Sequence, residues 1–404
     1  MKTQLLLIIV FLMLATLLGQ AQDFTYSQYF ANKTSLNPAF CVSERGVRLY
    51  THWREQSPGI ANTFLNHKGN VSFTFTKMLT PDIILGFGAM GNLQKEGEGG
   101  YSTNNFGAMM GAGLPFKLGD NNAIITTALQ INRHTTRLHW NQLVFSDQLH
   151  EVREDILYTS NAIAPDNLTH TYPSFNWGSL MVLPFNKKTR LIAGYKMRWL
   201  SKDLNANFDN SYVGIASLHT VHIAMEYENT WRSSKDNGIV FFPNAKLDWQ
   251  NGLSHINVGT FILSPEYRVA GNKQKGAYNT FWLGLFYQRS LQKIPEAYNG
   301  GVINENFFVT PQHTAAITPI LGYRWKTEYS TNQVSMSTDI AVSGLNFGAT
   351  WGNWELSYVL TLPEGFKNDS RKGSKKGPIK KFFQEIANPG GCPKFHATGD
   401  AMKL

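Results

Sequence analysis

A glycine-rich run is the first feature of this sequence whose residue types and spacing could support chemistry. Residues 86–91 (GFGAMG) match the spacing of a dinucleotide-binding fingerprint. In nucleotide-binding proteins such a run follows a strand and opens a helix whose N-terminus faces the pyrophosphate. No helical periodicity follows this run, so we interpret its glycines as a feature of strand packing and predict no cofactor.

The eleven histidines show no cluster with the spacing of metal ligands. His219 and His222 fall on opposite faces of one predicted strand, while His134 and His139 lie in a long predicted loop with no cysteine nearby. The Gly-x-Ser-x-Gly and His-Glu-x-x-His motifs of common hydrolases are also absent from the sequence. These observations predict a protein that is not an enzyme and has no catalytic, cofactor-binding or metal-binding site.

The clearest structural pattern is the run 189–199 (TRLIAGYKMRW). Its odd positions are apolar or aromatic, and its even positions include Arg190, Lys196 and Arg198. Successive side chains of a strand point to opposite faces, so this alternation suits a strand with lipid on one side and water on the other. One such strand would fit a soluble β-sandwich equally well. The runs 313–326 and 354–362 repeat the pattern, and this repetition favours the membrane.

Fourteen strands of this character predict an all-β fold, a transmembrane antiparallel β-barrel of about 14 strands within residues 46–363. The predicted strands are 47–54, 70–77, 83–91, 105–115, 123–133, 174–185, 189–199, 213–227, 239–250, 254–263, 279–289, 314–326, 334–345 and 354–362. Their connections mostly alternate between short and long, which predicts short periplasmic turns and odd strands that run outward. The connections 251–252 and 264–278 break this alternation, so a missed or extra strand is an open alternative there.

Composition agrees with a wall that faces lipid. Aromatic residues make up 13% of the 404 residues and charged residues only 16%, against about 25% charged in an average soluble domain. The net charge of +9 could indicate nucleic acid, but the segment after Pro363 holds nine Lys and Arg against four Asp and Glu. Five of the nine excess charges therefore belong to the tail, and no nucleic-acid partner is expected.

Both ends of the chain differ from the predicted barrel. Residues 1–21 combine a basic start with an apolar run and small residues, which predicts a signal peptide cleaved before Gln22. Residues 22–45 show no clear period and are predicted to be a periplasmic lead-in or a plug. In the basic periplasmic tail, 364–404, apolar residues at helical spacing over 379–386 predict a short amphipathic helix. An exported chain that crosses a membrane with strands is expected in the cell outer membrane.

The predicted lumen contains charges of both signs. A ring of cations on the inward faces would favour anions in a water-filled pore. Carboxylates such as Asp248, Asp339 and Glu355 share these faces, so an ordinary polar lumen fits as well. The cations expected to line the lumen are Arg190, Lys196, Arg198, Arg324 and Lys326.

Cys41 and Cys392 are the only cysteines, and both are expected to reach an oxidising compartment. They flank the predicted barrel and would lie on the same side of the membrane if the strand number is even. A disulfide between them and two unpaired thiols are both compatible with the sequence.

Four short motifs in a fixed order resemble a known family. Ser27-Gln28-Tyr29 precedes Asn37-Pro38-Ala39-Phe40, residues 279–288 (NTFWLGLFYQ) form an aromatic strand, and Cys392-Pro393-Lys394-Phe395 lies near the C-terminus. Together they resemble the PorP/SprF-like membrane proteins of the type IX secretion system. The nine residues after Phe395 depart from the family pattern, in which the chain is expected to stop, so a role for a free terminal Phe is not carried over.

The resemblance implies a non-enzymatic outer-membrane component of the type IX secretion and gliding machinery that exports, retains or anchors a cell-surface adhesin or similar partner. The implied partners are membrane lipid, the secretion motor or periplasmic peptidoglycan-linked proteins, and a surface adhesin with a C-terminal sorting domain. An outer-membrane channel for solutes or hydrophobic small molecules, and a soluble secreted β-sandwich, are the alternative interpretations. Candidate partner-binding residues in the two periplasmic segments are Tyr26, Gln28, Tyr29, Asn37, Pro38, Phe40, Phe382, Phe383, Pro393 and Phe395.

Overall fold

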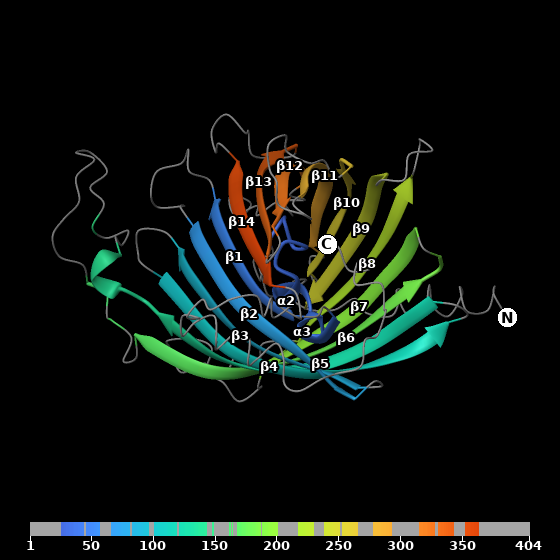
Figure 1. Ribbon diagram of the computed structural model, residues 1–404. Coiled ribbons are helices and arrows are strands. Elements are labelled where there is room, and N and C mark those ends of the chain that lie inside the picture. The colour runs from blue at the N-terminus through green and yellow to red at the C-terminus, as the bar shows by residue number, and fades with distance from the viewer. Residues whose placement is uncertain are drawn as a thin grey trace, which may run out of the picture.

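The chain forms a closed barrel of antiparallel strands, shown by the computed structural model in Figure 1. Each strand pairs with its sequence neighbours, and β1 (Gly46–Gln56) closes the barrel by pairing with β14 (Asn353–Leu362). Closure leaves no free sheet edge, which matters in lipid because unpaired backbone groups are costly there. The structure describes residues 26–43, 46–56, 66–80, 83–96, 101–118, 121–143, 148, 161–162, 164, 168–186, 188–200, 217–229, 238–250, 253–265, 278–292, 315–327, 330–342 and 352–362.

The predicted all-β barrel of about 14 strands is confirmed. In the region of doubtful strand count, β10 pairs with both β9 and β11, so no strand is missing or extra there. The remaining strands are β2 (Asn66–Thr80), β3 (Ile83–Glu96), β4 (Tyr101–Leu118), β5 (Asn121–Arg137), β6 (Thr169–Pro184), β7 (Thr189–Leu200), β8 (Leu218–Asn229), β9 (Ile239–Gln250), β10 (Leu253–Leu263), β11 (Tyr278–Gln292), β12 (Ala315–Lys326) and β13 (Thr331–Ala341).

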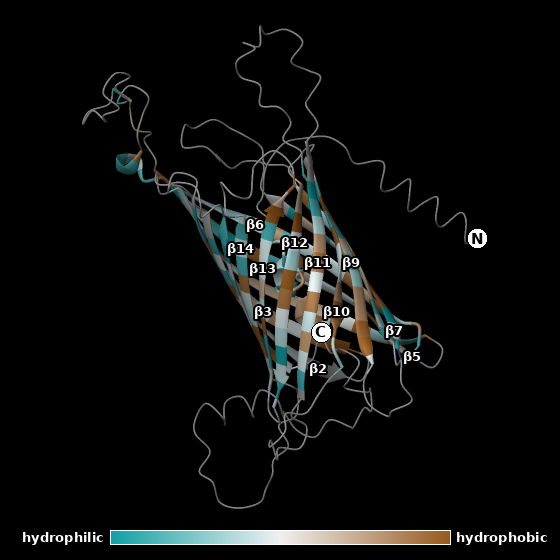
Figure 2. Ribbon diagram, turned by 90° about the horizontal axis from the view of Figure 1, so that it is seen from above, coloured by the Kyte–Doolittle hydropathy of each residue, from teal (hydrophilic) through white to brown (hydrophobic). Residues whose placement is uncertain are grey.

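Side chains alternate between the two faces of the wall, and the outward face is apolar. On β5, Ile125, Leu129 and Ile131 are 47%, 58% and 58% exposed, whereas Thr126 and Gln130 between them are buried. Figure 2 shows apolar segments along the strands around the barrel. A closed barrel with an apolar exterior suits the hydrocarbon of a bilayer. The barrel therefore spans a membrane, and the soluble β-sandwich interpretation is wrong.

The strand bounds distinguish the two ends of the barrel. At the end where β1 begins, most connections between consecutive strands are short in sequence, as between β6 and β7. At the opposite end the connections between β5 and β6 and between β11 and β12 are long. The connections β9–β10 and β10–β11 reverse this rule. Because short turns are periplasmic in bacterial barrels, we take the end where β1 begins as the periplasmic end and the opposite end as the outer end.

Residues 26–43 lie inside the barrel and are called the plug below. They contain two single-turn helices, α2 (Lys33–Leu36) and α3 (Phe40–Ser43), which Figure 1 shows within the ring of strands. Gly46, with a φ of 99°, turns the chain into β1. Within the described residues no helix has the length and apolar character needed to cross a bilayer.

The interior is less uniformly polar than the sequence interpretation expected. Polar side chains line much of the wall, but a buried apolar cluster joins plug residues such as Phe40 and Val42 to wall residues such as Phe261 and Phe286. The sequence left a water-filled pore open as one interpretation of the lumen. The plug occupies the space that such a pore would need. The lumen of this barrel therefore resembles a protein core.

Candidate functional site

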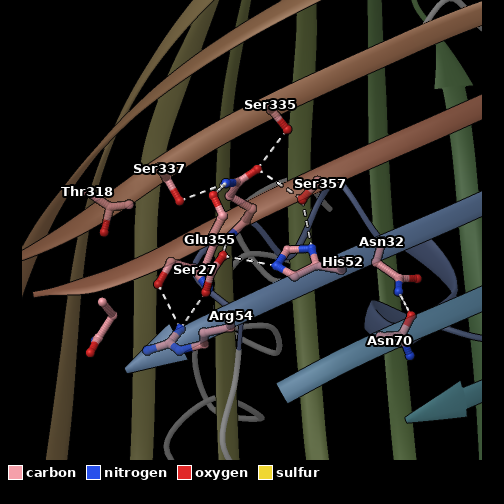
Figure 3. A network of polar contacts seen from close by, with 12 residues as sticks. Ser27, Asn32, His52, Arg54, Asn70, Thr318, Ser335, Ser337, Glu355 and Ser357 are labelled. Atoms are coloured by element: carbon pink, nitrogen blue, oxygen red, sulfur yellow. Dashed lines mark hydrogen bonds and ion pairs between the residues drawn. The ribbon is translucent and has the colours of Figure 1, made fainter. Parts of the chain in front are cut away.

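The N-terminal end of the plug is fastened to the wall by a buried network of charges (Figure 3). Arg54 of β1 lies 2.5 Å from Glu355 of β14 and 3.2 Å from Asp339 of β13. The backbone N–H groups of Ser27 and Gln28 each donate to Glu355 at 2.8 Å, and the Ser27 hydroxyl donates to Asp339 at 2.8 Å. We call these five residues the polar latch.

Strand register brings the wall residues of the latch together. Arg54 pairs directly with Glu355 in the β1–β14 register, and Glu355 pairs with Ser337 of β13. His52, two residues before Arg54 and on the same face, places Nε2 3.2 Å from Glu355. A buried charge is tolerated only when it is paired and hydrogen-bonded. Glu355, which is 1% exposed, therefore depends on the plug amides as well as on Arg54.

The Gln28 side chain is matched to the wall atom by atom. Its Nε2 donates to Ser337 Oγ at 2.8 Å and to the Glu355 carbonyl at 3.1 Å. Its Oε1 accepts from Ser335 at 2.7 Å and from Ser357 at 3.2 Å (Figure 3). A primary amide has two N–H donors and two acceptor lone pairs, and all of them are used here. Gln28 thus fixes the position of the plug against β13 and β14.

An aromatic contact follows the latch along the plug. The Phe30 ring lies 4.0 Å from Phe261 of β10 and 5.7 Å from Phe286 of β11, measured between ring centroids. Tyr29 beside it hydrogen-bonds Asn244 of β9. Burial raises the pKa of the Tyr29 phenol, and nearby Asp248 acts in the same direction, so the phenol stays neutral and can donate. This part of the plug is held by packing rather than by charge.

Helix α2 is fastened to β2. The Asn32 side chain caps the helix by accepting from the Ser35 backbone N–H at 3.2 Å, and it also hydrogen-bonds Asn70 (Figure 3). Thr34 Oγ1 lies 2.8 Å from Ser72 Oγ. A single helical turn is not stable alone in water, so these wall contacts explain why it forms.

Asn37 and Pro38 pack against glycines of the opposite wall. Asn37 Nδ2 donates to the backbone carbonyl of Ser179 on β6 at 2.9 Å and to that of Tyr195 on β7 at 3.1 Å. A Cβ atom on Gly178 would meet Pro38 at 2.9 Å and would also strike Asn37. The absence of a side chain at Gly178 therefore allows the plug to reach the wall.

Helix α3 rests on the wall formed by β2 to β5. Thr76 donates to the Cys41 carbonyl at 2.9 Å, and Thr126 donates to the Ala39 carbonyl at 3.2 Å. A Cβ atom on Gly86 would strike the Cys41 carbonyl and lie 2.8 Å from Val42 Cα. The first glycine of the run 86–91 thus packs against the plug.

The five cations predicted to line the lumen lie in two separate groups. Arg190 of β7 pairs with Glu226 of β8, and Lys196 donates to the Ser35 carbonyl of the plug at 3.0 Å. Arg324 of β12 donates to Gln333 of β13 at 3.2 Å. By alternation, Arg198 shares the face of Lys196, and Lys326 shares the face of Arg324. Four strands separate β7 from β12, so these residues do not form one ring.

The plug residues expected as a docking surface are not exposed. Tyr26, Tyr29 and Phe40 are each 6% exposed, Gln28 and Asn37 are 0% exposed, and Pro38 is buried. The expectation that these side chains face the periplasm is wrong, because the barrel wall covers them. The remaining candidate partner-binding residues, Phe382, Phe383, Pro393 and Phe395, lie outside the described residues. The predicted tail helix and the predicted signal peptide also lie outside them.

Cys41 should be unreactive in the folded protein. Its side chain is 0% exposed, and burial raises the pKa of its thiol to about 12, so the reactive thiolate is scarce at neutral pH. In a Cys392→Ser variant we expect a charged maleimide to label Cys41 only after unfolding, as measured by mass spectrometry. The positive control is an Asn186→Cys variant, which places a cysteine in an exposed turn. Rapid labelling of folded Cys41 would contradict the observed packing.

The sequence left open whether Cys41 and Cys392 form a disulfide or remain two unpaired thiols. Within the described part of the chain Cys41 has a free thiol. Cys392 lies outside the described residues, so the disulfide and the two unpaired thiols both stay alternatives.

The polar latch was missed by sequence reasoning. Asp339 and Glu355 were recognised as inward charges, but their contacts with Ser27 and Gln28 join residues more than 300 positions apart in sequence. The plug carries no periodic pattern that would predict which wall it touches. The available signal was an inward carboxylate opposite an inward arginine, Glu355 and Arg54, on the two strands that close the barrel.

Comparison with known proteins gives one informative match. Residues 18–360 match the family described as "Type IX secretion system membrane protein PorP/SprF". No curated protein matches the sequence. Similar solved structures include CdiB from Acinetobacter baumannii, at 10% identity and a TM-score of 0.41, covering 79% of this chain and 60% of that one.

Two other solved barrels show similar values. The CymD monoaromatic hydrocarbon channel shares 12% identity at a TM-score of 0.42, covering 82% of this chain and 93% of that one. The beta domain of the Bordetella autotransporter Brka shares 10% sequence identity at a TM-score of 0.36, covering 78% of this chain and 98% of that one. These similarities are too low to carry an argument about function. Because the family match covers most of the chain, this protein belongs to the PorP/SprF family of type IX secretion system membrane proteins, a family of secretion components rather than enzymes.

Proposed function

We propose that this chain is a plugged outer-membrane component of the type IX secretion and gliding machinery that retains or anchors a cell-surface adhesin or similar partner. The observation that carries the proposal is the plug, because the chain fills its own lumen. A protein that exports its partner through this lumen would have to remove the plug first. Retention or anchoring needs only a stable barrel with surfaces on both sides of the membrane.

The extent of plug contacts supports a closed resting state. The latch holds β1, β13 and β14, Phe30 packs on β10 and β11, and Asn37 bonds to β6 and β7. Helix α3 rests on the wall formed by β2 to β5. Each buried hydrogen bond contributes about 1 kcal/mol net, and leaving one group unpaired costs more. Removing the whole plug therefore breaks many contacts at once.

The same burial changes where partners would dock. The plug side chains Tyr26 to Phe40 are used by the barrel itself, so we assign them to closure. Contacts with the secretion motor or with periplasmic peptidoglycan-linked proteins are assigned to the tail, including Phe382, Phe383, Pro393 and Phe395. The adhesin would meet the outer loops, which connect the strands at the end opposite Gly46.

A channel for solutes is the alternative function, and the filled lumen argues against it. The lumenal cations that would serve such a channel already have partners, since Arg190 pairs with Glu226 and Lys196 binds the plug. Deletion of the gene tests the two functions in cells. Loss of a surface adhesin or of spreading motility would support anchoring. Normal secretion with lost uptake of a nutrient would reject it.

A locked plug should leave the anchoring function intact. Thr34 Oγ1 and Ser72 Oγ lie 2.8 Å apart, so a Thr34→Cys and Ser72→Cys pair is placed to form a disulfide between plug and wall. In a deletion strain, the oxidised double variant should restore adhesin display to the wild-type level, because the plug need not move. Surface immunolabelling of the adhesin measures this.

The single variants Thr34→Cys and Ser72→Cys are the matched controls, since each introduces one thiol without a cross-link. If the oxidised pair failed while both single variants and the reduced pair restored display, plug movement would be required. That result would replace anchoring by export through the lumen.

A further inference from the structure

A groove opens on the outward face of the barrel at β4, β5 and β6. Its volume is about 450 Å³, and its lining includes Phe106, Ile131, Arg133 and Pro173. Register places Arg133 of β5 between Phe106 of β4 and Pro173 of β6. Phe106 and Ile131 are 61% and 58% exposed, so the groove has apolar walls with an arginine at its edge.

The groove lies where the apolar face of the wall ends. Toward the periplasmic end, the outward positions of β5 are Ile131, Leu129, Thr127 and Ile125, all exposed and all apolar except Thr127. The Thr127 hydroxyl is hydrogen-bonded to Trp177 and to the Gly178 carbonyl. Toward the outer end the outward face of β4, β5 and β6 becomes polar, and its uncharged members are Ser102, Asn104, Thr135, Thr169 and Thr171. On the neighbouring β3 the apolar face continues to Leu93, which lies opposite Asn104 and is 56% exposed. This change marks the boundary between hydrocarbon and headgroups.

Cations gather on the headgroup side of this boundary. Arg137 lies four residues beyond Arg133 on the same face of β5, about 13 Å along the strand. Lys95 of β3 lies opposite Ser102 of β4, which itself lies opposite Arg137. All three cations are exposed, and the described positions between them carry no carboxylate. The patch therefore presents positive charge toward the lipid surround.

We propose that this groove and its cationic rim bind a phosphorylated lipid of the outer leaflet, lipid A. Arg133 and Arg137 hold the phosphate groups, and Phe106 and Ile131 contact an acyl chain. Arginine suits this role because its planar guanidinium can donate two parallel hydrogen bonds to a phosphate. The position at the outer end selects the outer leaflet. The proposal is independent of the function assigned to the plug.

The chemistry of the groove favours a lipid over a protein partner. Its apolar walls continue into the band that faces hydrocarbon, and its charge begins at the level of the headgroups. Basic pockets on membrane proteins bind anionic lipid headgroups in this way. A single arginine at a membrane boundary can simply extend toward water, but three neighbouring cations beside an apolar groove offer more than one phosphate contact.

The test measures retention of diphosphoryl lipid A by the purified full-length protein in detergent. Lipid A bound per barrel after size-exclusion chromatography is quantified by mass spectrometry over a concentration series. The Arg133→Gln and Arg137→Gln double variant should bind at least roughly tenfold more weakly, because charge-assisted hydrogen bonds are lost. Heat-modifiable gel mobility, checked for every variant, confirms that each barrel is folded.

Arg289→Gln is the matched control. Arg289 is exposed on the outward face of β11, and the described residues of β10 and β12 place no second cation beside it on that face. Its loss should leave lipid A retention unchanged.

Three outcomes would overturn the proposal. The first is no retention by the wild-type protein, and the second is an equal loss in Arg289→Gln. The third is equal or better binding of dephosphorylated lipid A, which would show that the phosphates are not selected, or of phosphatidylglycerol, which would show that lipid A is not selected over another phosphate-bearing lipid.

Discussion

A Glu355→Gln variant should release the plug and lower the stability of the barrel. Glu355 accepts from Arg54, His52 and the backbone N–H groups of Ser27 and Gln28. A glutamine offers one acceptor oxygen and turns an NH₂ group toward donors, so several of these groups lose their partner. Removing one member of a buried ion pair typically costs about 3–5 kcal/mol. Asp339 still faces Arg54, but it cannot reach both plug amides through the same oxygens.

Two measurements check this expectation. The midpoint of the heat-modifiable gel shift should fall, and trypsin should cleave after Lys33, which lies within the plug and is half-buried in the closed barrel. Glu226→Gln is the control, because Glu226 pairs with Arg190 away from the latch and its side chain is 18% exposed. A Glu355→Gln protein with the wild-type midpoint and an intact Lys33 bond would show that the latch does not hold the plug.

The barrel itself was predictable from the sequence because its organising rule is local. A strand with lipid on one side and polar groups on the other alternates every two residues, so each strand can be recognised on its own. The run 189–199 was recognised this way, and β7 spans Thr189–Leu200. Boundaries were less accurate, since β4 begins at Tyr101 and was expected at 105. Polar outer ends of strands lack the apolar face that marks the membrane segment.

The sequence left both a periplasmic lead-in and a plug open for residues 22–45, because nothing local distinguishes an internal element from an exposed segment. The plug aromatics Tyr26, Tyr29 and Phe40 were interpreted as a docking surface, although they are buried. Helices of one turn have no amphipathic repeat. Which wall each residue touches depends on strands far along the chain, so only closure of the barrel decides it.

One sequence signal of an occupied lumen was present in β11. Its outward residues Phe281 and Leu283 are exposed and apolar, but its inward residues Trp282 and Phe286 are also apolar and are 3% and 1% exposed. A strand that is apolar on both faces is typical of burial on both sides. Interpreted in this way, residues 279–288 would have predicted a packed interior rather than water.

Valine at Gly86 or Gly178 should open the pore. A Cβ atom on Gly86 would meet backbone atoms of Cys41 and Val42, which cannot move unless the plug moves. A Cβ atom on Gly178 would strike Asn37 and Pro38. Overpacking of this kind costs about 1–3 kcal/mol, and displacement of the plug from a wall it no longer fits relieves it. We therefore expect stepwise ion conductance from each variant in planar bilayers.

The wild-type barrel should show no such steps, and Gly91→Val is the matched control. Gly91 is on the same strand as Gly86 but faces outward, and its added Cβ would meet only the Phe106 ring, at 3.4 Å. Its conductance should stay at the wild-type level. If folded Gly86→Val and Gly178→Val barrels stayed closed, with the bond after Lys33 protected, the plug would tolerate the intrusion. Closure would then depend on the latch rather than on the fit of the plug against Gly86 and Gly178.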